Sequence, residues 1–587
     1  MTHQDDPYAL RPWLASYPEG VPADISDSDY STVVDLFRTS VASYADRISM
    51  ESFGATLSYR ELGRAADCVA SWLQSQGLQK GDRVAIMSPN VLAYPAVMFG
   101  VLNAGGVVVN VNPLYTHGEL EHQINDAEPR FIFVFENFAH TVEAAWPKMN
   151  VERAIVLAPG DLMGLRGLVV NFVSRHIKKM VPAYDLPGSI SFSQVLEAGA
   201  RKAPAPVEVT RDDIAFLQYT GGTTGVAKGA VLLHRNVAAN VEQSWAWLRW
   251  FLEPRGPHRM VTALPLYHIF GLTACCMLLL RTGGSCLLIA NPRDLPGFIA
   301  TLRKTRLTLF SGVNTLYAAL ADHPEIGSVD FSNVAMNISG GMSTQEVVAH
   351  QWKALSGKPI IEGYGLSETS PIVTINRPDI AEFTGCIGYP IPSTEISIRK
   401  SDGDIAPPGE RGELCVRGPQ VMPGYWRRPD ETAKVMTADG FFRTGDIAIL
   451  QPDGIVKIVD RLKDMILVSG FNVYPNEVEA VLVEHPKVKE AAVIGVPFEH
   501  SGEAPMAFIV PRDASLTREE LREFVHERLT GYKAPRFYEF RDSLPKTNVG
   551  KILRRALKDE HVARTLSAND EGRGRSVKTE IQEQEPN

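Results

Sequence analysis

The chain has 587 residues, of which 44% are hydrophobic and 22% are charged. Its length is several times that of a typical domain, so we expect two or more domains, and its composition is ordinary for a soluble globular protein. The formal net charge of −9 argues against general nucleic-acid binding, because no strongly basic field covers the whole molecule.

Cysteine usage and the start of the chain indicate a cytoplasmic protein. The cysteines are scattered, without a Cys-x-x-Cys pair or a histidine-rich cluster. This pattern favours reduced thiols over a disulfide framework or a zinc site. The first residues are acidic and polar, so no secretory signal is visible. Residues 1–30 are rich in Pro, Asp and Ser, which predicts a poorly ordered N-terminal arm.

A long segment without Asp, Glu, Lys or Arg runs from Val84 to Gly118. A membrane-spanning helix needs about 20 mainly apolar residues. Pro, Asn and Gly residues interrupt this segment too often to meet that requirement. We therefore predict a buried helix over roughly residues 91–103, a Gly-Gly turn, and a buried strand over residues 107–111.

Apolar runs of strand length alternate with amphipathic stretches from residue 31 to about residue 458. Examples of such runs are residues 130–135, 154–157 and 307–310. This alternation is typical of an α/β fold with layered helices and largely parallel sheets. The predicted large domain covers residues 31–459 and contains several sheets.

The pattern changes after Asp460, where the chain consists of short units. The sequence predicts a strand and turn, a helix, two strands and a helix, over residues 464–474, 475–485, 490–496, 505–511 and 517–529. These units indicate a small α+β domain over residues 460–564. Residues 565–587 are polar and charged with almost no apolar side chains, which predicts a disordered tail.

Residues 162–181 form a basic amphipathic stretch. Its apolar residues recur at helical spacing, and its positive charges are Arg166, Arg175, Lys178 and Lys179. Two interpretations stay open at this point. The helix could lie on an anionic bilayer surface, or it could pack on its own domain with a solvated basic edge.

The most informative stretch of the chain runs from Tyr219 to Ala230. It contains four glycines, three threonines and Lys228, directly after the strand-like residues 214–218. Glycines let the backbone curve closely around an anion, and successive N–H groups, threonine hydroxyls and a lysine can then bind a polyphosphate. The spacing differs from the common nucleotide loop G-x-x-x-x-G-K-[ST]. A flexible linker is the alternative, and the apolar residues 230–233 that follow argue against it.

Further motifs follow this loop along the chain. They are Leu264–Gly271, Ser339–Met342, Glu362–Thr369, Phe441–Asp446, Asp460–Pro475 and Leu544–Arg555. Together with the glycine-rich loop, in this order, they resemble the adenylate-forming enzymes, the superfamily of acyl-CoA synthetases, peptide-synthetase adenylation domains and luciferases. The resemblance covers nearly all of residues 31–560. The sequences of the motifs are most similar to those of bacterial long-chain fatty acid–CoA ligases.

The resemblance implies a site for ATP and Mg²⁺ in the large domain. The phosphate-binding residues that it implies are Thr220, Gly221, Gly222, Thr223, Thr224, Gly225 and Lys228. Tyr364 and Gly365 would lie at the adenine, with the Gly341 loop beside them, and Ser367 would contact the α-phosphate. Glu368 would hold Mg²⁺ together with Thr220, in keeping with the preference of Mg²⁺ for oxygen ligands. Threonine is the more common residue at the position of Ser367, but the hydroxyl is retained.

The resemblance assigns the remaining roles mainly to the small domain. Asp446 would bind the ribose hydroxyls, and Arg461 would contact the ribose or a phosphate. Asp460 would be a hinge, and the CoA channel would be lined by Gly470, Phe471 and Asn472. Lys551 would be catalytic, placed between the substrate carboxylate and the α-phosphate, where a positive charge stabilises developing oxyanions.

A histidine in an apolar run is often only a packed residue. In the family, however, the position of His268 lies at the mouth of the acyl pocket and helps to place the carboxylate. The apolar run from Leu272 to Leu280 could wall a hydrocarbon tunnel or belong to the core.

The implied activity is the ATP-dependent conversion of a long-chain fatty acid to an acyl-adenylate and then, with CoA as co-substrate, to acyl-CoA. Alternatives are a medium-chain or aryl acid–CoA ligase of the same superfamily and a non-catalytic lipid-binding relative. Peripheral contact with the inner membrane surface and a homodimer are compatible with the sequence and stay open.

Overall fold

The computed structural model describes residues 7–26, 31–220, 227–498, 501–547 and 550–564. The chain divides into two compact units, which are described separately. The large unit comprises the chain up to Thr444 together with Ile449–Lys457, and the small unit comprises Gly445–Ala448 and the chain from Ile458 onward. The predicted boundary at Asp460 lies close to Ile458. The inclusion of Gly445–Ala448 in the small unit was not expected from the sequence.

The first sheet of the large unit has the strand order β7-β6-β5-β3-β4-β8-β9. Its strands are β3 (Arg83–Met87), β4 (Val107–Val111), β5 (Phe131–Phe135), β6 (Arg153–Leu157), β7 (Ile190–Ser191), β8 (Ile214–Thr220) and β9 (Lys228–Leu233). All neighbouring pairs are parallel except the antiparallel pair of β8 and β9. Every residue of β4 and β5 is buried, as expected for parallel strands that are covered on both faces.

The second sheet has the strand order β16-β15-β14-β13-β12-β10-β11-β1-β2. Its strands are β1 (Ile48–Ser52), β2 (Ala55–Ser58), β10 (Arg259–Thr262), β11 (Ser285–Leu288), β12 (Leu309–Gly312), β13 (Met336–Ser339), β14 (Ile360–Gly365), β15 (Ile372–Ile375) and β16 (Tyr389–Pro390). Its central strands are parallel, and antiparallel pairs lie at both ends. The prediction of largely parallel sheets in an α/β fold is therefore confirmed.

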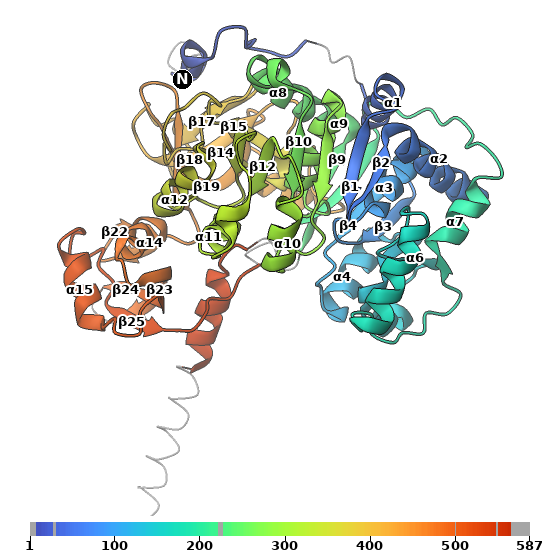
Figure 1. Cartoon of the computed structure of the whole chain (residues 1–587). Helices are drawn as coiled ribbons and strands as arrows, with labels where there is room; N and C mark the ends of the chain where they lie inside the picture. Colours follow the sequence, from blue (N-terminus) through green and yellow to red (C-terminus); the bar gives the residue numbers. More distant parts are fainter. Residues whose placement is uncertain (1–6, 27–30, 221–226, 499–500, 548–549, 565–587) are drawn as a thin grey trace, which may run out of the picture. The chain divides into compact units, whose positions relative to one another are not determined.

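Helices cover these sheets. The α-helices of the large unit are α1 (Val33–Ser43), α2 (Tyr59–Ser75), α3 (Ala93–Asn103), α4 (His117–Ala127), α5 (Ala139–Ala145), α6 (Leu165–Phe172), α7 (Phe192–Gly199), α8 (His234–Leu252), α9 (Leu278–Thr282), α10 (Leu295–Leu302), α11 (Asn314–Ala321), α12 (Glu346–Ser356) and α13 (Pro429–Val435). Helix α2 packs against α3 and α7 (Figure 1). Helix α3 is buried throughout, which explains why the segment from Val84 to Gly118 has no charge. No helix of the described part of the chain is both long enough and apolar enough to cross a membrane.

Shorter helical segments connect these elements. The 3-10 helices are η1 (Pro12–Ser16), η2 (Glu136–Phe138), η3 (Trp146–Lys148), η5 (Glu253–Arg255), η7 (Ile326–Ser328) and η8 (Ser367–Thr369), and the π-helices are η4 (Val173–Ile177) and η6 (Phe270–Met277). Helix α6 and the π-turn η4 together occupy most of the amphipathic stretch predicted over residues 162–181.

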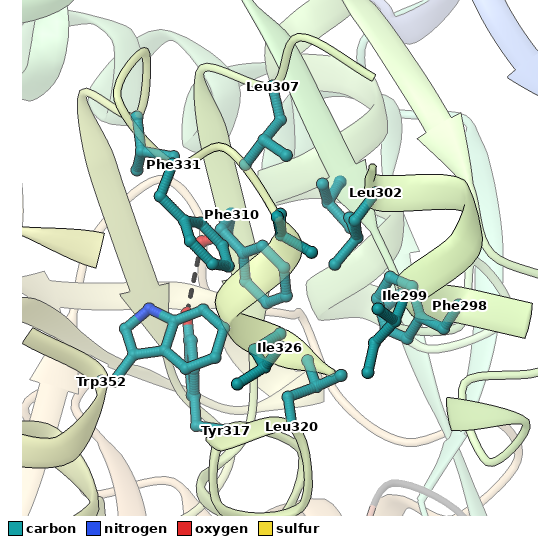
Figure 2. Close-up of a cluster of buried hydrophobic side chains, with 14 of the residues drawn as sticks. Phe298, Ile299, Leu302, Leu307, Phe310, Tyr317, Leu320, Ile326, Phe331 and Trp352 are labelled. Atoms are coloured by element: carbon teal, nitrogen blue, oxygen red, sulfur yellow. Dashed lines mark hydrogen bonds between the residues drawn. The ribbon is translucent and has the colours of Figure 1, made fainter. Parts of the chain in front are cut away.

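An aromatic cluster forms the core between α10, α11, α12 and the second sheet. The Trp352 ring lies 4.8 Å from the Tyr317 ring and 5.1 Å from the Phe310 ring, centroid to centroid. Figure 2 shows these rings packed against aliphatic side chains of α10 and α11. The Tyr317 hydroxyl donates to the Ile338 carbonyl oxygen at 2.8 Å, so the buried polar group is satisfied. This core holds β12 and β13, whose carboxyl ends lead into the candidate site.

The prediction of a poorly ordered N-terminal arm is wrong for residues 7–26. Trp13 in η1 is fully buried. The Tyr8 hydroxyl donates to the Ala406 carbonyl oxygen at 2.9 Å, and the Tyr17 hydroxyl donates to the Pro390 carbonyl oxygen. Aromatic side chains spaced along a Pro- and Asp-rich segment therefore tie it to the large unit, and composition alone did not reveal this.

A further sheet has the strand order β17-β18-β19-β20, with β17 (Glu395–Arg399), β18 (Gly412–Arg417), β19 (Phe442–Leu450) and β20 (Val456–Arg461). The division between the two units runs through β19 and β20. The middle of β19 thus belongs to the small unit, although it precedes β20 in the chain by several residues.

The small unit is built on a sheet with the strand order β22-β21-β24-β23, in which β25 also pairs with β24. Its elements are β21 (Ile466–Val468), β22 (Phe471–Val473), α14 (Pro475–Glu484), β23 (Val488–Phe498), β24 (Gly502–Pro511), α15 (Arg518–His526) and β25 (Phe537–Phe540). The predicted order of short strands and helices after Asp460 is confirmed, and β25 was not predicted.

Candidate functional site

The glycine-rich loop joins β8 to β9, as the sequence suggested. Thr220 at the end of β8 pairs with Lys228 at the start of β9. The predicted residues Gly221, Gly222, Thr223, Thr224 and Gly225 lie outside the described part of the chain. Thr220 and Lys228 are therefore the predicted phosphate-loop residues whose surroundings can be described.

Lys228 lies among acidic and aromatic partners. Its ammonium forms an ion pair with Glu431 of α13 and lies 5.5 Å from the centre of the Tyr425 ring. Hydrogen bonds from Lys228 and Lys434 lower the pKa of Glu431 to about 2. An incoming polyphosphate would compete with the Glu431 carboxylate for the Lys228 ammonium, because both are anions.

Glu368 lies close to the same hairpin. It belongs to η8, which contacts both β8 and β9, and its side chain is almost fully buried. The Tyr425 hydroxyl donates to Glu368 Oε1 at 2.7 Å. Burial and the neighbouring Glu368 carboxylate raise the pKa of Tyr425, so this hydroxyl stays protonated and keeps donating. Tyr425 thus links the predicted metal ligand to the lysine of the phosphate loop.

The donor set fits a magnesium–nucleotide complex better than a metal held by protein alone. No cluster of three or more His, Cys, Asp or Glu side chains suited to a metal occurs among the residues that the structure describes. Mg²⁺ in nucleotide sites is commonly held by one or two carboxylates together with phosphate oxygens. The Glu368 carboxylate, in η8 beside the strand that ends in Thr220, is suited to that pattern.

Tyr364 and Gly365 form the end of β14. A Cβ added to Gly365 would lie 1.9 Å from the Pro371 carbonyl oxygen, so a larger residue cannot occupy this position without moving the backbone. The loop that contains Gly341 starts at Ser339, which pairs with Glu362 in the parallel register of β13 and β14. The loop and the predicted adenine-binding residues therefore lie at neighbouring strand ends. In parallel sheets, ligands bind beyond this edge.

Glu362 is a buried carboxyl group beneath this edge. The Thr344 N–H donates to Glu362 Oε1 at 3.0 Å, and the Thr344 hydroxyl donates to Ser339 Oγ at 2.8 Å. Burial raises the pKa of Glu362 to about 7, although the bonds from Thr344 oppose the shift. Glu362 thereby fastens the Gly341 loop to β14.

The stability of Glu362→Gln, measured relative to the wild type at the same pH, is expected to increase as the pH rises. The folded protein holds a proton on Glu362 up to about pH 7, whereas in the unfolded chain the pKa of this carboxyl group is its ordinary value of 4.5. The free energy of unfolding therefore falls between these two pH values, by up to about 3 kcal/mol. Glutamine keeps the acceptor for Thr344 and removes the titration.

The apparent Tm of Glu362→Gln, relative to the wild type, should rise from about pH 5 to about pH 8. The exposed Glu197 of α7 provides a matched control, because Glu197→Gln should leave the pH dependence of Tm unchanged. A constant difference in Tm between Glu362→Gln and the wild type across this range would contradict the expectation.

The segment that carries His268 is held against β8. Gln218 Nε2 donates to the Tyr267 carbonyl oxygen at 2.8 Å. Asn110 Nδ2 donates to Gln218 Oε1 at 3.0 Å, and the Tyr94 hydroxyl lies 2.6 Å from Asn110 Oδ1 and 2.9 Å from the Leu266 carbonyl oxygen. Gln218 lies two positions before Thr220 in β8. These buried amides therefore connect the backbone beside His268 to the strand of the phosphate loop.

For the acyl-CoA ligase activity that the motifs imply, Gln218→Leu is expected to raise the KM for the acid about tenfold, with a smaller effect on kcat. Leucine leaves the Tyr267 carbonyl and the Asn110 amide without their partner, which costs about 1–3 kcal/mol and loosens the His268 segment. The measurement is steady-state kinetics at varied acid concentration.

Gln243 of α8 supplies the matched control for this variant. It is also a buried glutamine, and its amide donates to the Pro392 carbonyl oxygen at 2.8 Å. Gln243→Leu should lower Tm to a similar extent and leave KM unchanged. Equal changes of KM in the two variants would mean that Gln218 has no particular role in positioning the His268 segment.

In the small unit, the predicted nucleotide residues gather around Asp446. The Asp446 carboxylate is buried, and its Oδ1 lies 3.4 Å from Arg461 Nε. Burial and the nearby Arg461 guanidinium lower the pKa of Lys551 to about 7, and Asp446 opposes this shift. Burial and Arg461 also lower the pKa of Lys463, to about 8. A bound anion would favour the charged forms of both lysines.

Asp460 and the Gly470 loop occupy different parts of the small unit. The buried Asp460 carboxylate accepts hydrogen bonds from the Arg461 and Asn476 N–H groups, both at 2.7 Å, so it joins β20 to the start of α14. Gly470 lies in the turn between β21 and β22, next to the exposed Phe471 and Asn472. The Phe471 ring stacks on Tyr532 at 4.9 Å. Its exposure is suited to contact with a ligand, and its role stays a prediction.

Several residues of the site were missed in the sequence. Tyr425, Glu431 and Gln218 lie outside the motifs, with no distinctive spacing around them, and Lys463 lies within the motif Asp460–Pro475 but was assigned no role. Tyr425 lies in the Gly- and Pro-containing stretch 423–429, which was one available signal. Its partner Glu368 is far away in the sequence, and only the fold brings the two side chains together.

Two family models and several known proteins match this chain. Residues 37–426 match the family described as AMP-binding enzyme, and residues 477–551 match the AMP-binding enzyme C-terminal domain. The long-chain-fatty-acid–CoA ligase of Escherichia coli O6:H1 is 51% identical over 550 residues, covering 93% of this chain and 98% of that protein. The protein of the same name from Yersinia pestis is 52% identical over 552 residues, covering 94% and 98%.

Solved structures show the same architecture. The crystal structure of ATP-bound MatB from Rhodopseudomonas palustris is 29% identical, with a TM-score of 0.76, and the match covers 90% of this chain and 99% of that one. The family matches extend over most of both units and include Thr220, Lys228 and Glu368. The chain belongs to the family of AMP-binding enzymes.

Proposed function

We propose that this protein is an ATP-dependent long-chain fatty acid–CoA ligase. The observation that carries the proposal is that Lys228, Tyr425 and Glu368 lie together at the hairpin of β8 and β9. The near full-length likeness to enzymes named long-chain-fatty-acid–CoA ligases supports the choice of substrate. The reaction converts a fatty acid, ATP and CoA into acyl-CoA, AMP and pyrophosphate.

The first half-reaction is assigned to residues of both units. A carboxylate oxygen of the fatty acid attacks the α-phosphorus of ATP, and the bond from that phosphorus to the bridging oxygen breaks, which releases pyrophosphate. Lys228 and the hairpin that begins at Thr220 would bind the β- and γ-phosphates. Glu368 and Thr220 would hold Mg²⁺, which supplies positive charge to the phosphate oxygens when it is bound.

The roles of the small unit follow from its cluster of charges. Asp446 would accept hydrogen bonds from the ribose hydroxyls, with Arg461 beside it. Lys551 would donate to the reacting oxygens, because its ammonium is the charge that the developing oxyanions require. Its lowered pKa supports this role, since an anionic substrate would restore the charged form.

The second half-reaction needs a different set of side chains. The thiol sulfur of CoA attacks the acyl carbon, the bond to the AMP oxygen breaks, and the thiol proton passes to solvent. A rotation of the small unit about Asp460 would remove Lys551 and bring in the loop of Gly470, Phe471 and Asn472. Such rigid-body rotation about a few residues is a common means of changing an active site between steps.

The acyl chain would lie near His268. The apolar run from Leu272 to Leu280 is buried, as a wall of a hydrocarbon pocket or of the core would be. His268 would place the carboxylate, and the buried amides around Gln218 would hold its segment against β8.

An acyl-CoA assay by mass spectrometry tests the function. The purified protein is incubated with ATP, Mg²⁺, CoA and separate acids from acetate to oleate, together with aryl acids. Long-chain acyl-CoA as the main product is the expected result. A preference for medium-chain or aryl acids would replace the substrate assignment, and the absence of AMP with every acid would favour a non-catalytic lipid-binding protein.

We also propose that the enzyme works in peripheral contact with a membrane. Long-chain fatty acids partition into bilayers, so an enzyme that uses them gains access to substrate at that surface. A homodimer is the other assembly that the sequence leaves open, and vesicle co-sedimentation together with sedimentation velocity separates the two.

A further inference from the structure

An apolar surface on α6, η4 and the residues that directly follow η4 is exposed to solvent. Its six side chains, which we call the α6–η4 surface, are Leu165, Leu168, Val169, Phe172, Ile177 and Met180, and they are 85%, 68%, 64%, 58%, 65% and 49% exposed. Figure 1 shows α6 on the outside of the large unit. Exposed apolar groups gathered on one short segment are uncommon in soluble proteins and mark a contact surface.

The segment is attached to its own domain through small and polar residues. A Cβ added to Gly167 would lie 2.0 Å from the Gly160 carbonyl oxygen, so the two backbones are in direct contact. The Gly160 N–H donates to Asn171 Oδ1 at 2.7 Å. Arg175 donates to the buried Glu136 carboxylate at 2.8 and 2.6 Å. The helix therefore does pack on its own domain, but with its apolar side outward, which reverses the usual arrangement.

Positive charge lies within the same surface. Lys178 and Lys179 are exposed, and in the sequence they lie directly between Ile177 and Met180. Arg166 of α6 is also exposed and adds a further positive charge, whereas Arg175 is paired with Glu136. The chain as a whole carries a formal charge of −9 and would be repelled by an anionic surface. A local basic and apolar patch would fix which side of the molecule approaches.

We propose that the α6–η4 surface docks on an anionic lipid bilayer. Apolar side chains enter the boundary between headgroups and acyl chains, while the lysines pair with lipid phosphates, as in interfacial amphipathic helices. The exposed leucines and phenylalanine suit the apolar acyl chains of a bilayer, and the adjacent lysines suit its anionic headgroups. This inference rests on the proposed function in one respect, because the use of long-chain fatty acids is the reason for the enzyme to be at a membrane.

Vesicle co-sedimentation of the full chain, without ATP or fatty acid, tests the proposal. Vesicles of phosphatidylcholine with phosphatidylglycerol should bind the wild type, and raising the salt concentration should weaken the binding. The double variant Lys178→Glu/Lys179→Asn should bind these vesicles at least about tenfold more weakly. Asparagine is chosen because Lys179 has a φ of 49°, which asparagine tolerates.

The apolar contribution is tested separately. Leu168→Ser/Phe172→Ser should weaken binding to vesicles with and without phosphatidylglycerol, by at least about tenfold. Leu10→Ser is the matched control, since Leu10 is 89% exposed on the N-terminal segment of the same unit, and binding should not change. Circular dichroism and ligase activity with detergent-solubilised fatty acid show whether each variant is folded.

Binding that is equal for the wild type and both double variants would overturn the proposal. The proposal would also be overturned if the wild type did not bind vesicles but formed dimers in sedimentation velocity, and if Leu168→Ser/Phe172→Ser disrupted those dimers. The surface would then bind a second copy of the chain. Failure of the proposed function gives a different result, namely vesicle binding without acyl-CoA formation.

Discussion

Lys551→Ala is expected to abolish formation of the acyl-adenylate while leaving thioester formation from supplied acyl-adenylate largely intact. The Lys551 ammonium is the group assigned to the developing oxyanions, and removal of such a charge in phosphoryl transfer costs about 10³-fold or more. The second half-reaction, in which CoA attacks the acyl carbon, is proposed to use the loop of Gly470, Phe471 and Asn472 instead. The two steps should therefore respond differently to the same substitution.

Two measurements separate the steps. Release of pyrophosphate from ATP in the presence of fatty acid reports adenylation, and acyl-CoA formed from synthetic acyl-adenylate and CoA reports thioesterification. Lys558→Ala is the control, because Lys558 is an exposed lysine a short distance further along the same unit. It should leave both rates unchanged. Equal loss of both steps in Lys551→Ala would contradict the role assigned to Lys551.

Glu368→Gln should reduce pyrophosphate release by a similar factor and raise the Mg²⁺ concentration needed for half-maximal rate. Glutamine keeps an acceptor for the Tyr425 hydroxyl, which donates at 2.7 Å, so the packing of η8 is retained. It removes the negative charge that favours a divalent cation, and Mg²⁺ binds carboxylates much better than amides. The loss should be concentrated in the metal-dependent step.

A Mg²⁺ titration of pyrophosphate release checks this expectation. The control is Glu382→Gln, since Glu382 is an exposed glutamate of the large unit that pairs with Lys353. Tm measurements on both variants establish that folding is retained. If Glu368→Gln lost activity without any change in its Mg²⁺ dependence, Glu368 would act on the nucleotide or on Tyr425 rather than on the metal.

The elements of the fold were largely predictable because their signals are local. The buried strand β4 has the predicted bounds, and α3 begins two residues later than predicted. Helix α14 and strands β23 and β24 follow the predicted order after Asp460. The strand predicted over residues 307–310 is displaced to Leu309–Gly312, because a short apolar run carries little information about its ends.

The order of the N-terminal segment could not be predicted from its amino-acid composition. Pro- and Asp-rich residues indicate disorder on average, but burial of Trp13 and the hydrogen bonds of Tyr8 and Tyr17 offset the entropic cost of ordering the chain. Which surface those aromatic side chains meet depends on residues around 390 and 406. No local pattern contains that information.

The sequence by itself determined the α/β class, the order of the motifs and which charged groups are predicted to bind phosphates. These depend on spacing along the chain, such as the glycines between Thr220 and Lys228. Only the tertiary structure decided that Tyr425 donates to Glu368, that Gln218 holds the His268 segment, and that α6 presents its apolar side to solvent. Such contacts join residues far apart in the chain. Burial and hydrogen bonding depend on which groups are close in space, and the spacing of residues along the chain does not determine that.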